Sequence, residues 1–101
     1  MSDNQRGLLL RPELTTAQRA AIKWFHNRGG EGVFTKGQVL LARGELAAVM
    51  RSTWNALEQA SPPLVTYSAG KGYKRVAITD AGKVVAMNYT GSEADTVEDD
   101  W

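Results

Sequence analysis

Hydrophobic positions recur at helical spacing in the first patterned stretch of this chain. Thr15 begins a Thr-x-x-Gln capping-box pattern, in which a hydroxyl and a side-chain amide bond the free backbone N–H groups at a helix start. Apolar residues then follow at intervals of three and four as far as Phe25. Gly29 and Gly30 end the pattern, because glycine adopts the left-handed conformation found after helices. We therefore predict a helix at residues 16–28.

The next apolar run is short and is bounded by glycine-containing turns. Val33–Phe34 predicts a very short strand. Thr35 then opens a second Thr-x-x-Gln pattern, and four apolar residues follow before Arg43–Gly44 interrupts the run. This pattern predicts a short helix at residues 36–42.

Residues 45–60 carry the clearest amphipathic pattern. On a helix at about 100° per residue, one mainly apolar face collects Leu46, Val49, Met50, Thr53, Leu57 and Ala60. The opposite face collects the small or hydrogen-bonding residues Ala48, Arg51, Ser52, Asn55 and Gln59. Trp54 falls at the boundary between the two faces. A helix that only needs solubility more often carries Glu and Lys outside, so this polar face is a candidate recognition surface.

Two strand-like runs follow the Pro62–Pro63 pair that stops this helix. Residues 64–68 and 73–78 are rich in β-branched and aromatic residues and flank a short glycine-containing loop, which predicts a β-hairpin. The hairpin carries three cations at its tip and on its return strand: Lys71, Lys74 and Arg75. Thr79 then offers a cap for a short helix at about residues 81–89.

Composition places these elements in one small domain. The chain has 101 residues, of which 43% are hydrophobic and 23% charged, the usual mix of a globular domain. It contains no cysteine, which excludes a disulfide framework and suits a reducing compartment, so we predict a cytoplasmic location. Leu8–Leu10 is too short a run for a signal peptide or a membrane span, so we predict no membrane association.

The net charge of +1 hides an asymmetry along the chain. Residues 1–90 hold all 12 Lys and Arg against six acids, a formal +6, whereas residues 91–101 hold five acids and no base. A basic body that binds an anion fits this distribution, and so does a solubilising tail on a mildly basic domain. We divide the chain into an N-terminal arm (1–14), a domain (15–90) and a disordered acidic tail (91–101).

The order of the predicted elements resembles the winged helix-turn-helix superfamily: a helix, a short helix, a longer helix and a basic hairpin. Val49–Glu58 is similar to the recognition helix of bacterial winged-helix regulators, which often reads hydrophobic-Ser-x-Ser-Thr-hydrophobic-x-x-Leu-Glu. Tyr73–Lys83 is similar to the end of the wing in MarR-like regulators, where a basic strand runs into Leu-Thr-x-x-Gly-Arg and a helix.

The resemblance covers roughly residues 15–90. It implies an α+β winged helix-turn-helix with three helices, a β-hairpin wing and a short C-terminal helix. The small size suggests a phage, plasmid or prophage regulator. The implied function is sequence-specific binding of double-stranded DNA in transcription regulation, with helix 45–60 in the major groove and hairpin 64–79 on the backbone or in the minor groove.

Helix 45–60 has the residue types that such recognition needs. Ala48 and Ser52 are small enough for close approach to the base edges. Arg51 can donate a fork to guanine, and Asn55 can pair with adenine. Ser52 and Gln59 can reach bases or phosphates. The other interpretation is that these are ordinary exposed positions of a packing helix.

Five further residues are candidate DNA contacts outside that helix. Lys71, Lys74 and Arg75 of the hairpin can bind phosphate or enter the minor groove. Hairpins also carry lysine simply to protect a sheet edge. Lys36 and Gln38 lie at the start of the predicted helix 36–42, where the helix N-terminus favours phosphate.

No set of residues in the sequence forms a catalytic constellation. His26 is the single histidine and, without cysteine, builds no ordinary zinc site. It also lacks a nucleophile partner for a hydrolase triad. Gly70–Gly72 lacks the rest of a phosphate-binding loop. We predict no enzymatic activity, no cofactor and no metal.

Two hypotheses concern protein partners. A domain this small has limited affinity for DNA, so a homodimer on a two-fold site is one hypothesis, with Leu8–Leu10, helix 16–28 or helix 81–89 as its interface. The alternative function is a winged-helix protein-interaction module that binds a host polymerase or replication factor through the acidic tail and Trp101.

Overall fold

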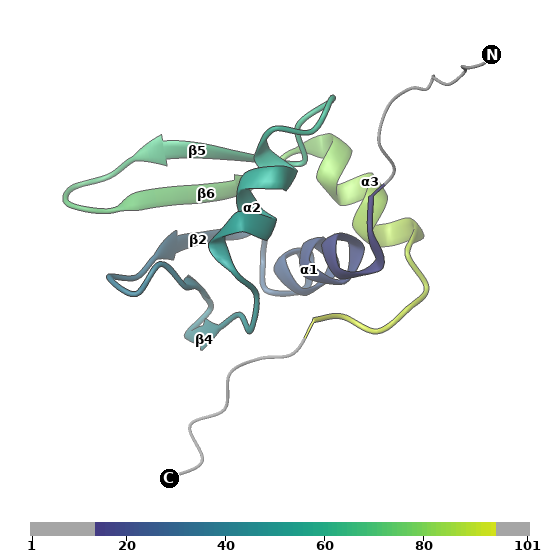
Figure 1. Cartoon of the computed structure of the whole chain (residues 1–101), viewed down its shortest axis with the longest axis horizontal. Helices are drawn as coiled ribbons and strands as arrows, with labels where there is room; N and C mark the ends of the chain where they lie inside the picture. The colour runs from purple at the N-terminus through teal and green to yellow at the C-terminus, as the bar shows by residue number, and fades with distance from the viewer. Residues whose placement is uncertain (1–13, 95–101) are drawn as a thin grey trace, which may run out of the picture.

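The computed structural model describes residues 14–94, in which the strands form one antiparallel sheet and the helices pack beside it (Figure 1). In chain order the elements are α1 (Thr16–Asn27), β2 (Glu31–Phe34), β3 (Leu40–Ala42), β4 (Glu45–Leu46), α2 (Arg51–Glu58), β5 (Val65–Ala69), β6 (Lys74–Ile78) and α3 (Asp80–Asn88). The described chain is thus a mixed α+β fold with three helices. Predictions about Leu8–Leu10 and Trp101 concern residues outside the described part.

The five strands form a single sheet in the order β4-β3-β2-β6-β5. All neighbouring strands are antiparallel, and β2 pairs with β3 on one side and β6 on the other. The predicted hairpin is confirmed as β5 and β6, but β6 also pairs with β2. It is therefore part of a larger sheet rather than a free-standing hairpin. Figure 1 shows its tip at one end of the molecule and α1 and α3 together at the other.

The helix predicted at residues 16–28 is confirmed as α1, and its capping box is formed. Thr15 Oγ1 accepts from the N–H of Gln18 at 3.0 Å, while Gln18 Oε1 accepts from the N–H of Thr15 at 2.9 Å. Gly30 then turns the chain into β2 with a φ of 74°. A Cβ at Gly30 would lie 2.4 Å from Ile78 Cγ2, so this turn requires glycine for conformation and for space.

The helix predicted at residues 36–42 is wrong, because these residues form a turn and strand β3. The Thr35 hydroxyl accepts from the N–H of Val39 at 3.3 Å, and the Thr35 carbonyl accepts from the N–H of Gln38 at 2.9 Å. Threonine makes such local bonds in turns as well as at helix caps, so the Thr-x-x-Gln pattern does not distinguish the two. Arg43–Gly44 then links β3 to β4, with φ values of 53° and 77°, as two-residue hairpin turns require.

The helix predicted at residues 45–60 is only partly correct. Its first residues form β4 and a loop, and α2 begins at Arg51. Met50, expected on the apolar face, is the N-cap residue and is 75% exposed. Trp54, expected at the boundary, is fully buried, as is Leu57. The true helix is therefore rotated relative to the predicted one, with Trp54 at the centre of its buried face.

An aromatic cluster joins α2 to α1. The Trp54 ring lies 5.5 Å from the Phe25 ring in an edge-to-face arrangement and 6.5 Å from the Trp24 ring. All three side chains are fully buried. Their core continues into the sheet through Phe34, Leu40, Val65 and Val76. Aromatic residues of this size bury the most apolar area per residue, so this cluster contributes strongly to fixing the helices in place.

The helix predicted at residues 81–89 is confirmed as α3, and the chain after it turns back along α1. Lys23 Nζ donates to the Gly91 carbonyl at 2.7 Å, and the N–H of Ala94 donates to the Ala20 carbonyl at 3.0 Å. Residues 91–94, assigned to the tail from the sequence, therefore contact α1. Residues 95–101 lie outside the described part.

Arg28, at the end of α1, ties this returning segment to the sheet. Its guanidinium lies 2.7 Å from a Glu93 oxygen and 3.0 Å from a Glu45 oxygen, and stacks 4.8 Å from the Trp24 ring centre. Burial opposes a charge on Glu93, but the hydrogen bond from Asn27 and the ion pair with Arg28 outweigh it. The pKa of Glu93 is therefore below its ordinary value.

Truncation of Trp54 should be far more damaging than truncation of Met50, although the hydrophobic pattern alone favours both as core residues. We expect Trp54→Ala to lower the free energy of unfolding by about 3–5 kcal/mol, because it leaves a cavity between Trp24 and Phe25. Met50→Ala should change it by no more than about 0.5 kcal/mol. Urea unfolding measures both. Equal losses would contradict the rotation of α2 described above.

The stability that Glu93 contributes should depend on pH. Its pKa is lowered in the folded chain, so the contribution is complete above the ordinary value of 4.5 and is lost as the pH falls through the folded-state value. Glu93→Gln should therefore be less stable than the unmodified chain at pH 7, and the gap should close in acid. Urea unfolding between pH 7 and 3 tests this, with Glu58→Gln as control, because Glu58 makes no ion pair or side-chain hydrogen bond with a described residue. A gap that persists in acid would contradict the ion-pair explanation.

Candidate nucleic-acid interface

A hollow of about 340 Å³ opens where three segments meet: the loop between β2 and β3, the start of α2, and the tip of the β5–β6 hairpin. We call it the basic groove, and it is lined by Phe34, Thr35, Lys36, Gln38, Arg51, Gly72, Tyr73 and Lys74. These segments are far apart in the sequence, and the sheet brings them together because β6 pairs with β2.

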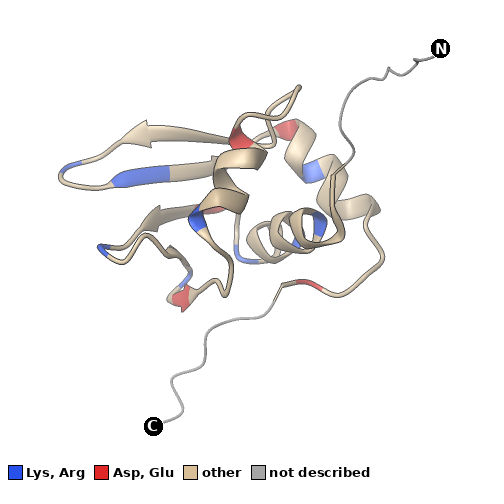
Figure 2. Cartoon of the chain, viewed as in Figure 1, with Lys and Arg blue, Asp and Glu red and all other residues tan. Residues whose placement is uncertain are grey.

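Positive charge gathers around the basic groove (Figure 2). Lys36, Arg51 and Lys74 line it, and Lys71 precedes its Gly72 at the hairpin tip. No acidic residue occurs in the stretches 32–44 and 59–79. Clustered charges of one sign in a hollow concentrate counter-ions there, so the groove attracts anions.

Arg51 is held inside the groove by aromatic rings rather than extended into solvent. Its guanidinium carbon lies 4.0 Å from the centre of the Phe34 ring and 5.6 Å from that of Tyr67. Arg51 Nη1 donates to Gln38 Oε1, whereas Arg51 Nε is buried without a hydrogen-bond partner among the described residues. The charge of Arg51 is thus fixed on one wall of the groove.

Gln38 holds an uncommon backbone conformation next to Arg51. Its φ of 66° lies in the left-handed region, which side chains other than glycine and asparagine adopt at a cost. The hydrogen bond from Arg51 and the turn closed by Thr35 hold it there. Such strain is concentrated at binding sites more often than elsewhere.

Asn55 is also partly engaged by the hairpin. Tyr67 Oη donates to Asn55 Oδ1 at 2.7 Å. Burial raises the pKa of Tyr67 more than the charge of Arg51 lowers it, so the hydroxyl keeps its proton at neutral pH. Pairing with adenine uses both the oxygen and the nitrogen of an asparagine amide. Here the oxygen already accepts from Tyr67, while Asn55 Nδ2 has no partner among the described residues.

Tyr73 lines the basic groove but is not among the ten candidate DNA contacts predicted from the sequence. Its side chain is 45% exposed and its ring lies against the Gly70 backbone. A Cβ at Gly70 would be 2.3 Å from Tyr73 Cε1. Gly70 therefore leaves the space that the Tyr73 ring occupies. The hairpin geometry reveals this contact, whereas the sequence alone does not.

The structure brings together four of the ten candidate contacts and separates the rest. Lys36, Gln38, Arg51 and Lys74 line the basic groove, and Lys71 is exposed beside it. Three exposed candidates lie outside the groove: Ala48 in the loop before α2, Ser52 in its first turn and Gln59 at its C-cap. Arg75 lies on the opposite face of the sheet from Lys74, because successive strand residues point to opposite sides.

Residues 14–94 contain no group of three or more His, Asp or Glu side chains arranged to hold a metal ion. In the same part of the chain, no helix combines the length and apolar content needed to cross a bilayer. Comparisons with models of protein families, with curated proteins and with solved structures gave no match for the chain.

Proposed function

We propose that the protein binds double-stranded DNA, with the sugar–phosphate backbone in the basic groove. The observation that carries the proposal is the convergence of Lys36, Arg51 and Lys74 from three separate segments on one hollow that no acidic residue lines. Lysine ammonium groups and the arginine guanidinium are the usual protein partners of phosphate oxygens.

The start of α2 adds to the attraction. The N-cap residue Met50 makes no side-chain hydrogen bond. In the first turn the N–H of Thr53 donates to the Met50 carbonyl at 3.0 Å, whereas those of Arg51 and Ser52 have no partner among the described residues. These groups carry the positive end of the helix dipole, which favours an anion. The helix start without a side-chain cap and the three cations around the hollow both support phosphate binding.

A polymer fits better than a small anion, because the cations continue beyond the hollow. Lys71 lies in the hairpin turn, so the row of cations that includes Lys74 runs on to the hairpin tip, which is blue in Figure 2. We call this row the positive strip. Successive phosphates of one DNA strand could then be engaged along the strip, with the hairpin tip over the adjacent groove of the duplex.

A role in transcription regulation is supported by the resemblance to winged-helix regulators. The order α1, α2, β5, β6 fits that layout only in part, because the β3–β4 pair stands in place of the second helix and the hairpin belongs to a five-stranded sheet. In this arrangement the exposed Ser52 and Gln59, with the free amide nitrogen of Asn55, are the base-reading groups of α2. Arg51 supplies charge rather than a guanine contact, because its guanidinium is stacked on Phe34.

Removal of single groove cations should weaken DNA binding and reduce its dependence on salt. For Lys36→Ala and Lys74→Ala we expect the slope of log K against log salt to fall by about one unit each. Lys83→Ala, which removes the same charge from the exposed surface of α3, should leave the slope unchanged. Fluorescence anisotropy with a labelled duplex at several salt concentrations measures all three.

Equal slopes for the groove variants and the Lys83 control would contradict the groove as the binding site. Selection of bound fragments from a random duplex library then tests base reading. An enriched motif that Gln59→Ala or Ser52→Ala relaxes would support α2 as the reader. No retention of DNA at low salt would overturn the proposal and favour the protein-interaction function.

A further inference from the structure

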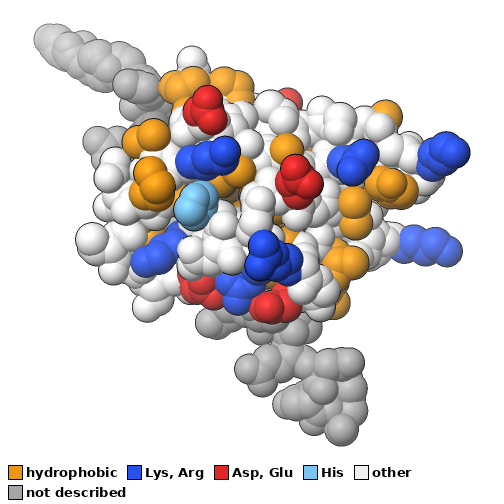
Figure 3. Space-filling model, turned by 180° about the vertical axis from the view of Figure 1, so that it is seen from behind, with side chains coloured by type: hydrophobic (Ala, Val, Ile, Leu, Met, Phe, Trp, Pro, Cys, Tyr) orange, Lys and Arg blue, Asp and Glu red, His pale blue; other side chains and the backbone are white. Residues whose placement is uncertain are grey.

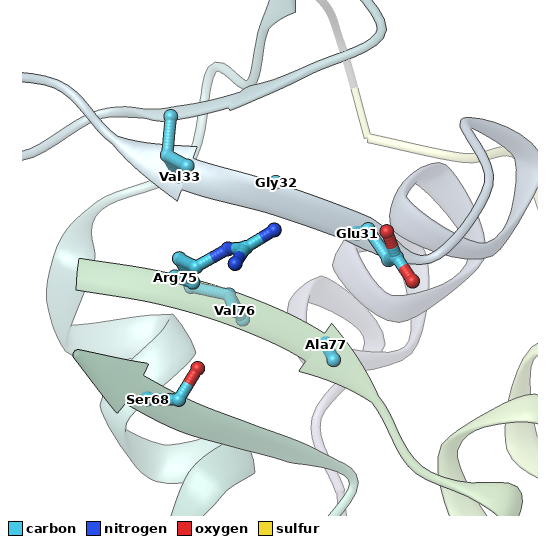
Figure 4. A pocket seen from close by; sticks show the side chains of 7 residues that line it. All are labelled: Glu31, Gly32, Val33, Ser68, Arg75, Val76 and Ala77. Atoms are coloured by element: carbon cyan, nitrogen blue, oxygen red, sulfur yellow. The ribbon is translucent and has the colours of Figure 1, made fainter. Parts of the chain in front are cut away.

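The face of the sheet opposite the helices is open and hollowed. A cavity of about 360 Å³ lies there, lined by Glu31, Gly32, Val33, Ser68, Arg75, Val76 and Ala77. Figure 4 looks onto this face, with the helices behind the strands. Phe34 and Val76 point to the buried side, so their neighbours Val33, Arg75 and Ala77 point outward. We call this surface the open face.

The open face carries one acid and one base that have no partner. Glu31 and Arg75 are both exposed, and neither makes an ion pair or side-chain hydrogen bond with any described residue. Figure 4 shows the Arg75 guanidinium lying across the sheet toward Gly32, with the Glu31 carboxylate turned away from it. The two charges are therefore available to a molecule that covers the face.

The sheet register places these charges symmetrically about an apolar diagonal. Glu31 pairs with Ala77, and Val33 pairs with Arg75. Glu31 and Arg75 therefore occupy one diagonal of a four-residue square on adjacent strands, where diagonal neighbours are about 7–8 Å apart. Val33 and Ala77 occupy the other diagonal. The pattern is self-complementary under a two-fold rotation about the Val33–Ala77 line.

We propose that the open face binds a second copy of this chain. With the two-fold axis along the Val33–Ala77 diagonal, Val33 faces Val33 and Ala77 faces Ala77 of the partner, and each Glu31 faces an Arg75. The half-buried Leu41 and Leu46 continue the row from Val33 across β3 and β4 and extend the apolar contact. The strands of the two copies then cross at roughly 70°, near the orthogonal class of sheet packing.

A second copy fits this face better than nucleic acid or an acidic peptide. Glu31 would repel either anion from the position next to Arg75. Figure 3 shows the molecule from behind, where acidic, basic and apolar side chains are intermingled. The basic groove, in contrast, is lined by cations and no acid. In a two-fold contact both copies use the same surface, so that surface must carry both a positive and a negative charge for opposite charges to meet.

Charge reversal tests this pairing. Glu31→Arg and Arg75→Glu each place like charges together twice in the dimer, so each should raise the dissociation constant of the dimer by about tenfold or more. The double variant E31R/R75E restores opposite charges and should return it to near the original value. Sedimentation equilibrium over a concentration series measures this. Lys83→Glu on α3 is the control for reversal of one charge, and circular dichroism verifies folding of each variant.

A second substitution tests the apolar diagonal independently. Val33→Lys brings two ammonium groups together at the axis and should also prevent dimerisation. Four outcomes would overturn the proposal: an unmodified chain that stays monomeric at all concentrations, a dimer that neither reversal weakens, a double variant that is not restored, or a Val33→Lys variant that dimerises normally. A dimer that is weakened neither by the charge reversals nor by Val33→Lys would have its contact elsewhere, for example on the exposed Val84 and Met87 of α3.

Discussion

The burial of Trp54 between Trp24 and Phe25 determines how α2 presents its other residues. At about 100° per residue, Arg51 lies about 60° from Trp54 around the helix, on the side of Phe34 and Tyr67. Asn55 lies about 100° from Trp54 on the same side as Arg51, so Tyr67 reaches both residues and donates to Asn55. Ser52 and Gln59 lie farthest from Trp54 and are exposed. One packed ring thus decides which polar residues face the hairpin and which face solvent.

Strand β6 connects this core to two different surfaces. Val76 is buried and anchors the strand, so Lys74 lies on the side of α2 and the basic groove. Arg75 and Ala77 then lie on the open face. Because β6 pairs with both β2 and β5, each surface also receives residues from neighbouring strands. The adjacent cations Lys74 and Arg75 therefore lie on separate surfaces, which the number of charges in the hairpin does not reveal.

Local signals predicted α1, the β5–β6 hairpin and α3, because a formed capping box, paired β-branched runs and a Thr79 cap determine structure within a few residues. The β3–β4 pair was missed because the Thr35 pattern is compatible with a helix cap and a turn, and long-range pairing with β2 decides between them. The groove was predicted in part. Its cations were identified by charge, whereas the position of Tyr73 and the stacking of Arg51 depend on contacts between distant segments.

The two proposed surfaces have a joint geometric consequence. The basic groove lies on the helix side of the sheet, and the open face lies on the other. In the proposed dimer the two open faces are in contact, so the two grooves point away from each other. Such a dimer cannot place both grooves on adjacent half-sites along one side of a straight duplex. It would bind one duplex on each side and join two DNA segments, or two distant sites on one looped molecule, so DNA bridging distinguishes it from a dimer on a compact palindrome.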